Sequence, residues 1–423
     1  MFINKLLTSD LFHATARSLQ KNTMKIATCQ FSDSYFPIMD GVGITAHSYA
    51  YWLNEKYGKS MLIAPKVKGY KDNVDYKVYR FKSVLLPGMN PYRVGLPLID
   101  LDFKKKVKKI KFDLLHAHCP FISGQLAAKL AIKHNVPLVA TFHTKYRDDF
   151  KKVLNNDLFV DFLLKLTLDF YNNADLVWVP NNATGLTLRE YGYHGSYEVM
   201  ENGTDMMIPE KSKLLKYKKK GLDMIEAGPD ELVMLFVGQH RWEKNVRLII
   251  DSLNMLKTSG ESFRMVFVGE GYAAGEMMKL VRQYNIQDHV VFTGVITDRK
   301  ELQNIYAASD LLVFPSVYDN SPLVLQEAAA FDVPSVVVSK SSSAEGISDG
   351  VNGFLVENNV ESLTHKIREL INHPDAIKKA GEGARKSIYH PWESIVDKVH
   401  RRYVELIREH QPAVTHQWED DEE

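Results

Sequence analysis

The chain has 423 residues, of which 45% are hydrophobic, so it is long enough for two domains with buried cores. Lysine and arginine number 53 against 52 aspartate and glutamate, a balance that gives no sign of a nucleic-acid partner. The two cysteines, Cys29 and Cys119, lie in apolar surroundings and argue against a disulfide framework or a zinc site. No apolar run approaches the roughly 20 residues of a membrane span, and residues 1–23 lack a signal-peptide core. We therefore expect a cytoplasmic protein.

The first half of the chain alternates short apolar runs with helical stretches. Residues 1–23 form an extension before Met24, where the first predicted strand begins. The predicted elements that follow are a strand at 24–31, a loop with Pro37, Gly41 and Gly43, a helix at 44–57, strands at 60–64, 114–118, 137–142 and 175–179, and helices at 123–134 and 158–172. Apolar strands that alternate with helices are typical of a parallel sheet covered on both faces.

The same pattern restarts after a lysine-rich, turn-rich join at about 203–230. The predicted elements are strands at 232–237, 263–268, 290–293, 311–315 and 334–338, and helices at 246–258, 361–372 and 392–410. The fold class is therefore α/β, with two doubly wound units. We place the domains at 24–205 and 206–389, and the acidic residues 411–423 form a tail.

Two basic runs, 104–111 and 211–220, place apolar residues among lysines at helical spacing. Such a helix can bind an anionic membrane surface. It can equally be a solvated helix face whose lysine stems cover apolar surface. The sequence leaves both interpretations open.

Polar residues follow the predicted strands of the first domain. The loop PIMDGVG, which ends at Gly43, lies where glycines let the backbone approach a phosphate, although a plain tight turn needs the same residues. It is not a dinucleotide fingerprint, which counts against an NAD enzyme. His118 and His143 end neighbouring strands, where each can meet a sugar or phosphate or serve as a buried structural histidine.

The second domain carries more charge at its strand ends. The loop 238–245 (GQHRWEKN) combines a glycine, two cations and a helix start, which favours a diphosphate over the alternative of an exposed charged turn. Lys244 there can neutralise charge on a departing phosphate. Asp319 and Glu327 flank a second strand-loop-helix, where the amides at 320–324 suit phosphate or sugar oxygens and Glu327 can accept vicinal hydroxyls.

These motifs occur in an order that resembles the retaining GT-B glycosyltransferases of family four. The ordered set is DGVG, HAHCPF, FHT, NGTD, EKN, FVGEG, VVFTG and a D-x7-E block before VPSVV. The resemblance covers Met24 to about Arg408 and implies two Rossmann-like domains facing across a cleft. It also implies that the terminal helix, 390–410, crosses back to the first domain.

The resemblance implies a role for each matching residue. Lys244 binds the diphosphate, Asp319 contacts the donor sugar and Glu327 binds the ribose hydroxyls. Gly43 lies over the phosphates, His118 lies near the sugar, and the backbone at Val295 meets the base. The implied catalytic residues are His118, Asp319 and Lys244; the donor-binding residues are Gly43, Gln239, Arg241, Lys244, Val295, Asn320, Ser321, Leu323, Val324 and Glu327; the acceptor-binding residues are His143, Thr144 and Tyr146.

Two positions depart from the family pattern. Asp319 replaces the family's first glutamate and is shorter by one methylene, which puts the sugar contact in doubt. Gln239 stands where the family has an arginine, and glutamine binds a diphosphate less well. We expect Arg241 to supply the missing cation.

The implied reaction is the transfer of a hexose from a nucleotide diphosphate sugar to a lipid or glycan acceptor. The expected nucleotide of the donor is UDP. The family's proposed route retains the anomeric configuration, with the leaving diphosphate as the acceptor's base. It requires no metal or other cofactor. FHTKY and DGVG are similar to bacterial diacylglycerol glucosyltransferases, so a membrane lipid and peripheral contact with the inner face of an anionic membrane are expected. The alternatives are a nucleotide-sugar epimerase on the same fold and a non-catalytic nucleotide-sugar-binding protein.

Overall fold

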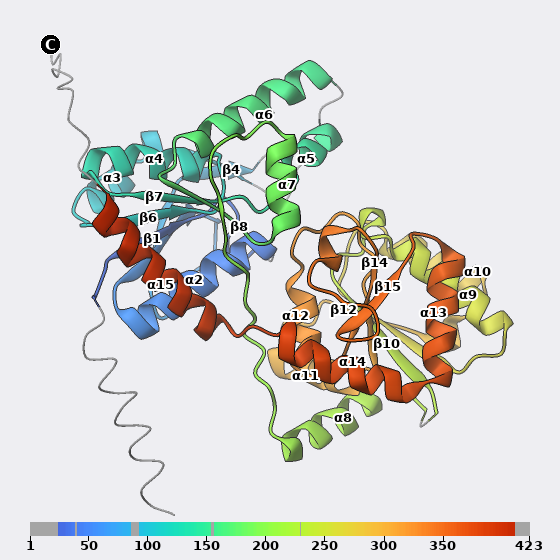
Figure 1. Cartoon of the computed structure of the whole chain (residues 1–423). Coiled ribbons are helices and arrows are strands. Elements are labelled where there is room, and N and C mark those ends of the chain that lie inside the picture. Colours follow the sequence, from blue (N-terminus) through green and yellow to red (C-terminus); the bar gives the residue numbers. More distant parts are fainter. Residues whose placement is uncertain (1–23, 39, 86–92, 154–155, 229, 411–423) are drawn as a thin grey trace, which may run out of the picture. The chain divides into compact units, whose positions relative to one another are not determined.

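The computed structural model describes residues 24–38, 40–85, 93–153, 156–228 and 230–410 (Figure 1). The predicted extension, 1–23, and the predicted tail, 411–423, lie outside these residues. The chain forms two compact units. The first comprises residues up to Phe142, Lys165–Trp178 and the residues from Val396; the second comprises His143–Leu164 and Val179–Ile395. Among the described residues, no helix has the length and apolar character needed to cross a membrane.

The first sheet has seven strands in the order β3-β2-β1-β6-β7-β8-β9. The strands are β1 (Thr28–Phe31), β2 (Ser60–Pro65), β3 (Lys77–Phe81), β6 (Leu114–Ala117), β7 (Leu138–Thr141), β8 (Leu176–Val179) and β9 (Glu198–Val199). The pairs from β3 to β8 are parallel. β1, β2, β6, β7 and β8 are buried along their whole length, so they read as apolar runs in the sequence.

The helices between β1 and β9 along the chain are α2 (Gly41–Tyr57), α3 (Leu101–Val107), α4 (Ile122–His134), α5 (Tyr146–Val153), α6 (Asp157–Asn172) and α7 (Asn182–Glu190). A small antiparallel pair, β4 (Ser83–Leu85) and β5 (Arg93–Gly95), stands apart. The helix predicted to begin at residue 44 begins at Gly41, because the Asp40 side chain accepts a hydrogen bond from the Gly43 amide (2.8 Å) and caps it. The basic run 104–111 is helical only as far as Val107.

The second sheet has six parallel strands in the order β12-β11-β10-β13-β14-β15. The strands are β10 (Leu232–Val237), β11 (Phe263–Val268), β12 (Val290–Gly294), β13 (Leu311–Val313), β14 (Ser335–Val338) and β15 (Gly353–Val356). The helices of this part of the chain are α8 (Lys211–Ile225), α9 (Val246–Thr258), α10 (Ala274–Gln283), α11 (Arg299–Ala308), α12 (Leu323–Ala329), α13 (Val360–Asn372) and α14 (Pro374–Ser387). The terminal helix α15 (Trp392–Glu409) follows them.

Both sheets have doubly wound topology, which confirms the predicted fold class. In each sheet the first strand is central, the next two lie to one side and the later strands lie to the other. The winding direction therefore reverses between β1 and β6 in the first sheet and between β10 and β13 in the second. Ligands of such domains bind at the carboxyl ends of the strands that flank this reversal. The loops after these four strands are therefore the places to look for a site.

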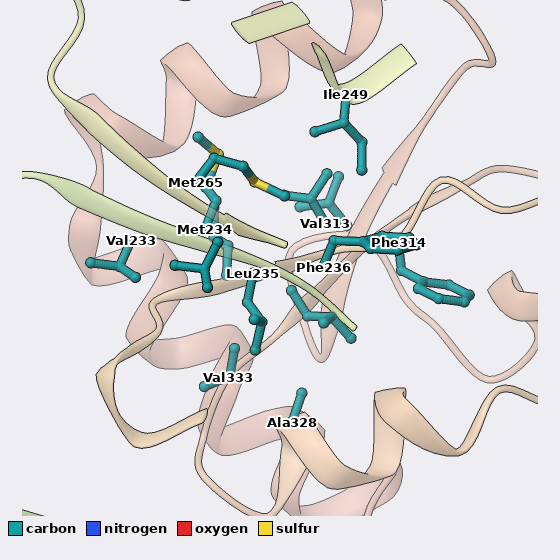
Figure 2. Close-up of a cluster of buried hydrophobic side chains, with 14 of the residues drawn as sticks. Val233, Met234, Leu235, Phe236, Ile249, Met265, Val313, Phe314, Ala328 and Val333 are labelled. Carbon is teal, nitrogen blue, oxygen red and sulfur yellow. The ribbon is translucent and has the colours of Figure 1, made fainter. Parts of the chain in front are cut away.

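The core of the second sheet forms around β10. Met234, Leu235 and Phe236 are fully buried and pack with Ile249 of α9 and Ala328 of α12 (Figure 2). Figure 2 labels both Phe236 and Phe314 in this cluster. Their rings stack with centroids 5.8 Å apart. The strands β10 and β13 lie side by side, since Met234 pairs with Leu311 in the sheet.

The lysine-rich run 211–220 lies in the helix α8, which packs against α11. The close approach requires Gly221, because a Cβ there would lie 2.0 Å from the carbonyl oxygen of Asn304. The lysines face solvent: Lys211, Lys213, Lys216, Lys218, Lys219 and Lys220 are all exposed.

The terminal helix α15 packs on the first unit from Val396 onward, beside α2 in Figure 1. The rings of His400 and Tyr57 stack with centroids 3.7 Å apart. The Tyr403 ring stacks on Trp178 (5.4 Å), and its hydroxyl pairs with Nδ1 of His116 (2.5 Å). The last described helix thus supplies part of the first unit's core.

Candidate functional site

The loops that leave β10 and β13 bring Lys244 and Asp319 together. The Lys244 ammonium forms an ion pair with the Asp319 carboxylate, although the residues are 75 positions apart in the chain. The hydroxyl of Ser316 donates to the other Asp319 oxygen at 2.6 Å. Lys244 Nζ also lies 5.7 Å from the centroid of the Tyr318 ring. Two residues predicted separately as catalytic therefore form one charged pair at the topological reversal of the second sheet.

The local backbone explains how Lys244 reaches this place. A short 3-10 turn, Trp242–Lys244, ends at Asn245, which adopts a left-handed conformation (φ 60) just before α9. Asparagine tolerates this conformation better than most residues. Its Nδ2 donates to the carbonyl oxygen of Pro315 (3.2 Å) and so ties the two loops together.

Arg241 lies beside Gln239 in the same loop. Its guanidinium donates to Gln239 Oε1 (3.3 Å) and to Glu243 Oε1 (3.2 Å) and lies 5.8 Å from the Tyr272 ring. Burial acts to lower the pKa of Arg241, but the neighbouring Glu243 carboxylate outweighs it and raises that pKa. Arg241 is thus a fixed cation next to the glutamine. Its assignment as the substitute for the missing arginine stays a prediction.

Glu327, on α12, is 8% exposed, and two donors from α11 hold its carboxylate. Arg299 donates to Oε1 at 3.0 Å, and the Tyr306 hydroxyl donates to Oε2 at 2.7 Å. Arg299 also pairs with Asp205 of the NGTD motif. Each carboxylate oxygen has two lone pairs, so one acceptor position per oxygen remains for a vicinal diol.

Sequence reasoning missed Arg299 and Tyr306 as partners of Glu327. They lie seven residues apart on α11, a spacing that puts both side chains on one helix face. That spacing was the available signal. The spacing predicts that Arg299 and Tyr306 share a partner, but it does not identify that partner.

The segment 320–324 precedes and opens α12. Asn320 is buried, and its Nδ2 donates to the carbonyl oxygen of His143 (2.8 Å). Ser321 is half-buried, Pro322 occupies the N-cap position without a capping hydrogen bond, and Leu323 and Val324 begin the helix. The predicted donor-binding amides therefore lie within a few residues of Asp319.

The predicted acceptor residues lie where β7 leads into α5. Burial lowers the pKa of His143 to about 3, so its imidazole is neutral at physiological pH. Thr144 is half-buried, and its carbonyl oxygen accepts from the Tyr146 amide (2.9 Å). The Tyr146 side chain is buried. Their contact with an acceptor stays a prediction.

A pocket of about 560 Å³ opens at the ends of β10, β11 and β12. Its lining consists of His240, Gly269, Glu270, Gly271, Ala274, Met278, Phe292 and Gly294. The exposed side chain of Val295 follows directly after Gly294. His240 was not among the predicted site residues, although it ends a strand-loop junction just as His118 does.

In the first unit, the predicted residues are already engaged by the protein. The Gly43 amide donates to Asp40, so the chain's own carboxylate occupies the start of α2 where a phosphate was expected. His118 is 0% exposed; its Nε2 pairs with Gln30 Oε1 (3.0 Å), and the His116 and Tyr49 rings pack against it. His118 is therefore a buried, hydrogen-bonded histidine in this structure, and its contact with the sugar stays a prediction.

Within the described ranges, no cluster of three or more histidine, cysteine, aspartate or glutamate side chains can hold a metal ion. Cys29 and Cys119 are both buried thiols. The expectation that the reaction needs no metal or cofactor remains an expectation.

The arrangement in the second unit combines three capacities. Lys244 and Arg241 supply positive charge, the Glu327 carboxylate can accept a pair of hydroxyls, and Asp319 can accept from a further hydroxyl. A diphosphate joined to a ribose and a second sugar carries all the matching groups.

Comparison with known families covers most of the chain. Residues 39–207 match the family described as Glycosyltransferase Family 4, and residues 223–387 match Glycosyl transferases group 1. An alpha-monoglucosyldiacylglycerol synthase of Acholeplasma laidlawii is 22% identical over 80% of this chain and 86% of its own length. A GDP-mannose-dependent alpha-mannosyltransferase of Corynebacterium glutamicum is 22% identical over 89% of this chain and 88% of its own length.

Solved structures share the fold. Sucrose-phosphate synthase of Thermosynechococcus elongatus has a TM-score of 0.76 at 19% identity, covering 91% of this chain and 100% of that one. The Anabaena protein HepE in complex with UDP and glucose has a TM-score of 0.69 at 17% identity, covering 90% and 99%. With the two matched families and the two doubly wound sheets, these likenesses identify the chain as an enzyme: it is a glycosyltransferase of the family four type with the GT-B fold.

Proposed function

We propose that this enzyme transfers a hexose from a UDP-linked sugar to a lipid or glycan acceptor with retention of the anomeric configuration. The observation that carries the proposal is the Lys244–Asp319 pair at the reversal of the second sheet, with Glu327 on the helix that follows. The charge and hydroxyl-accepting groups of this region match a nucleotide diphosphate sugar.

Each residue has a part in the proposed reaction. Glu327 accepts the two ribose hydroxyls, and Asp319 accepts a hydroxyl of the hexose. Lys244 then turns from Asp319 toward the diphosphate and, with Arg241, stabilises the charge that develops as the bond to the anomeric carbon breaks. These side chains take the charge-neutralising role, so the proposal includes no metal or cofactor.

The acceptor hydroxyl attacks the anomeric carbon from the face that the diphosphate leaves. Its oxygen forms the new glycosidic bond, and its proton passes to the departing diphosphate oxygen, which serves as the base. His118, His143, Thr144 and Tyr146 are assigned to the sugar and acceptor. Neutral His143 can donate or accept a hydrogen bond there, because burial lowers its pKa to about 3.

The nature of the donor is supported by related proteins. The Acholeplasma relative is named as an alpha-monoglucosyldiacylglycerol synthase. The HepE structure is a complex with UDP and glucose. The Corynebacterium relative depends on GDP-mannose, so GDP-mannose is the informative competitor in any donor test.

A membrane lipid is the proposed acceptor, with α8 as a region that contacts anionic headgroups at the cytoplasmic face. All six lysines of α8 face solvent, and Leu215 between them is 72% exposed. A lysine near an anionic bilayer contributes about 1 kcal/mol to binding. The second basic run, 104–111, adds lysines on α3.

The test uses the purified full chain with UDP-glucose or GDP-mannose, with and without phosphatidylglycerol vesicles that contain diacylglycerol. We expect release of UDP that depends on the vesicles, and an α-linked glycolipid by NMR. Sugar interconversion without acceptor and without UDP release would favour the epimerase. Binding of UDP-glucose without turnover on lipid or glycan acceptors would favour a non-catalytic binding protein.

A further inference from the structure

The pocket at the ends of β10, β11 and β12 is built by three loops that hydrogen bonds join to one another. The His240 amide donates to the Glu270 carbonyl (2.9 Å), and the Ala273 amide donates to the His240 carbonyl (3.0 Å). The Gly269 amide donates to the Gly294 carbonyl (2.8 Å). Such a backbone framework is a pre-formed site rather than a gap that side chains can close.

Glycines keep the loops close enough to share this framework. Gly269 has a φ of +130, and a Cβ there would lie 2.0 Å from the Gly238 carbonyl oxygen. At Gly271 a Cβ would lie 2.3 Å from the His240 carbonyl oxygen. No other residue fits either position, so the loop after β11 lies directly against the loop that carries His240.

The side chain of His240 is the unexplained group of this pocket. It is 1% exposed, and among the described residues neither imidazole nitrogen has a hydrogen-bond partner. The rings of Phe236, Phe267 and Phe292 surround it, with centroids 6.3, 6.0 and 6.1 Å away. Buried polar groups are almost always paired, because leaving one unpaired destabilises the fold. A leucine in this aromatic cage would avoid that cost.

The other lining residues of the pocket supply the apolar and polar surfaces that a heterocycle needs. Met278, Ala274 and Phe292 form an apolar wall, and the glycine loops form a polar edge of backbone groups. His240 lies on the same loop as Lys244, four residues before it, so the pocket adjoins the proposed diphosphate position. Burial lowers the pKa of His240 to about 4, which leaves a neutral imidazole with one donor and one acceptor.

The base of the nucleotide sugar is expected beside Val295, the residue that follows the pocket-lining Gly294. We infer that the His240 imidazole supplies a hydrogen bond to this base. The inference rests on the proposed function and adds a residue that recognises the base. A lactam edge, such as that of uracil or guanine, presents both an N–H donor and a C=O acceptor, and either can pair with a neutral imidazole. The unpaired histidine is thus retained for the ligand at the expense of the free protein's stability.

The test compares His240→Leu with wild type in two measurements of the full chain. Replacing an unpaired buried imidazole by leucine should raise the melting temperature of the free protein. It should also weaken UDP binding about fivefold to tenfold, the effect of one neutral hydrogen bond. Inorganic pyrophosphate, which lacks the base, should bind both proteins equally.

Two further variants serve as controls. Met278→Leu changes the apolar wall without removing a polar group, so it should not produce opposite changes in stability and affinity. His240→Gln keeps a donor and an acceptor and should recover part of the UDP affinity. Unchanged UDP affinity in His240→Leu, an equal loss for pyrophosphate, or a lower melting temperature would overturn the inference.

Failure of the proposed function can be distinguished from failure of the His240 assignment. If wild-type protein releases no nucleotide diphosphate from any donor, the proposed reaction is wrong. If turnover is normal and His240→Leu shows none of these effects, only the assignment of His240 is wrong.

Discussion

The two sheets satisfy the polar side chains at their central strand ends in different ways. After β1, Asp40 is held by Ser34 and by the Gly43 amide; at the end of β6, His118 is enclosed and paired with Gln30. After β10 and β13, Lys244 and Asp319 have each other as partners, and both are only partly buried. Lys244 and Asp319 lie on two different loops, so a ligand can take the place of either partner in the ion pair. We conclude that the second sheet presents an ion pair open to exchange, whereas Asp40 and His118 of the first unit are held by hydrogen bonds within that unit.

The largest expected effect lies at the exchangeable pair. Lys244→Gln should lower the rate of nucleotide diphosphate release by about 100-fold to 1,000-fold, because the developing charge loses its preorganised cation. Steady-state release of UDP measures this. Lys378→Gln, on the exposed face of α14, is the matched control. Equal rates in both variants would remove Lys244 from the reaction.

A smaller effect is expected at the ribose contact. Glu327→Gln should weaken UDP binding about tenfold to 100-fold, because a carboxylate accepts hydrogen bonds more strongly than an amide. Calorimetric titration with UDP measures the affinity, and Glu361→Gln in the exposed first turn of α13 serves as control. A change in turnover without a change in UDP affinity would contradict the ribose assignment.

At the hydrogen-bonded His118 of the first unit, we expect an effect on stability. His118→Ala should lower the free energy of unfolding by about 1–3 kcal/mol, since it opens a cavity and removes the partner of Gln30 Oε1. Chemical denaturation measures this, with the exposed His365→Ala as control. Unchanged stability with a collapse in turnover would show instead that His118 contacts the sugar, as the sequence predicts.

The smallest effect concerns pH. The pKa of His240 is lowered from 6.5 to about 4 by burial, so the folded state binds fewer protons than the unfolded state between these values. Its contribution to stability is full above pH 6.5 and is lost as the pH falls toward 4. Lowering the pH from 7 to 5.5 should therefore cost wild type about 1 kcal/mol more than His240→Leu. Parallel pH profiles of unfolding would contradict this.

The fully buried strands could be predicted from the sequence because burial on both faces leaves an apolar run, as in β10 and β11. Most of the strands that were missed lack such a run, although β15 (GFLV), a mostly buried apolar strand, was missed as well. β3 (KVYRF) is mostly half-exposed, and β4 and β5 have only three residues each. Strand patterns of this kind are set by tertiary pairing and carry little local signal.

The site shows the same division. Lys244, Asp319 and Glu327 could be located because each lies on a recognisable strand-loop-helix. Their pairing could not be predicted, since it depends on strand order and on loops 75 residues apart. The partners of Glu327 on α11 and the unpaired imidazole of His240 were missed for the same reason. Whether a buried polar group is satisfied is a property of the packed core.

The position of Tyr403 has a consequence for how the protein is made. This ring completes the packing around Trp178 and His116 in the first unit, yet the ribosome adds it only after the entire second unit has been synthesised. The strands of the first unit are synthesised first, but their core is complete only when α15 has been added. The second unit can finish folding before that. A chain that stops before residue 403 therefore lacks a core side chain of the unit whose strands were made first.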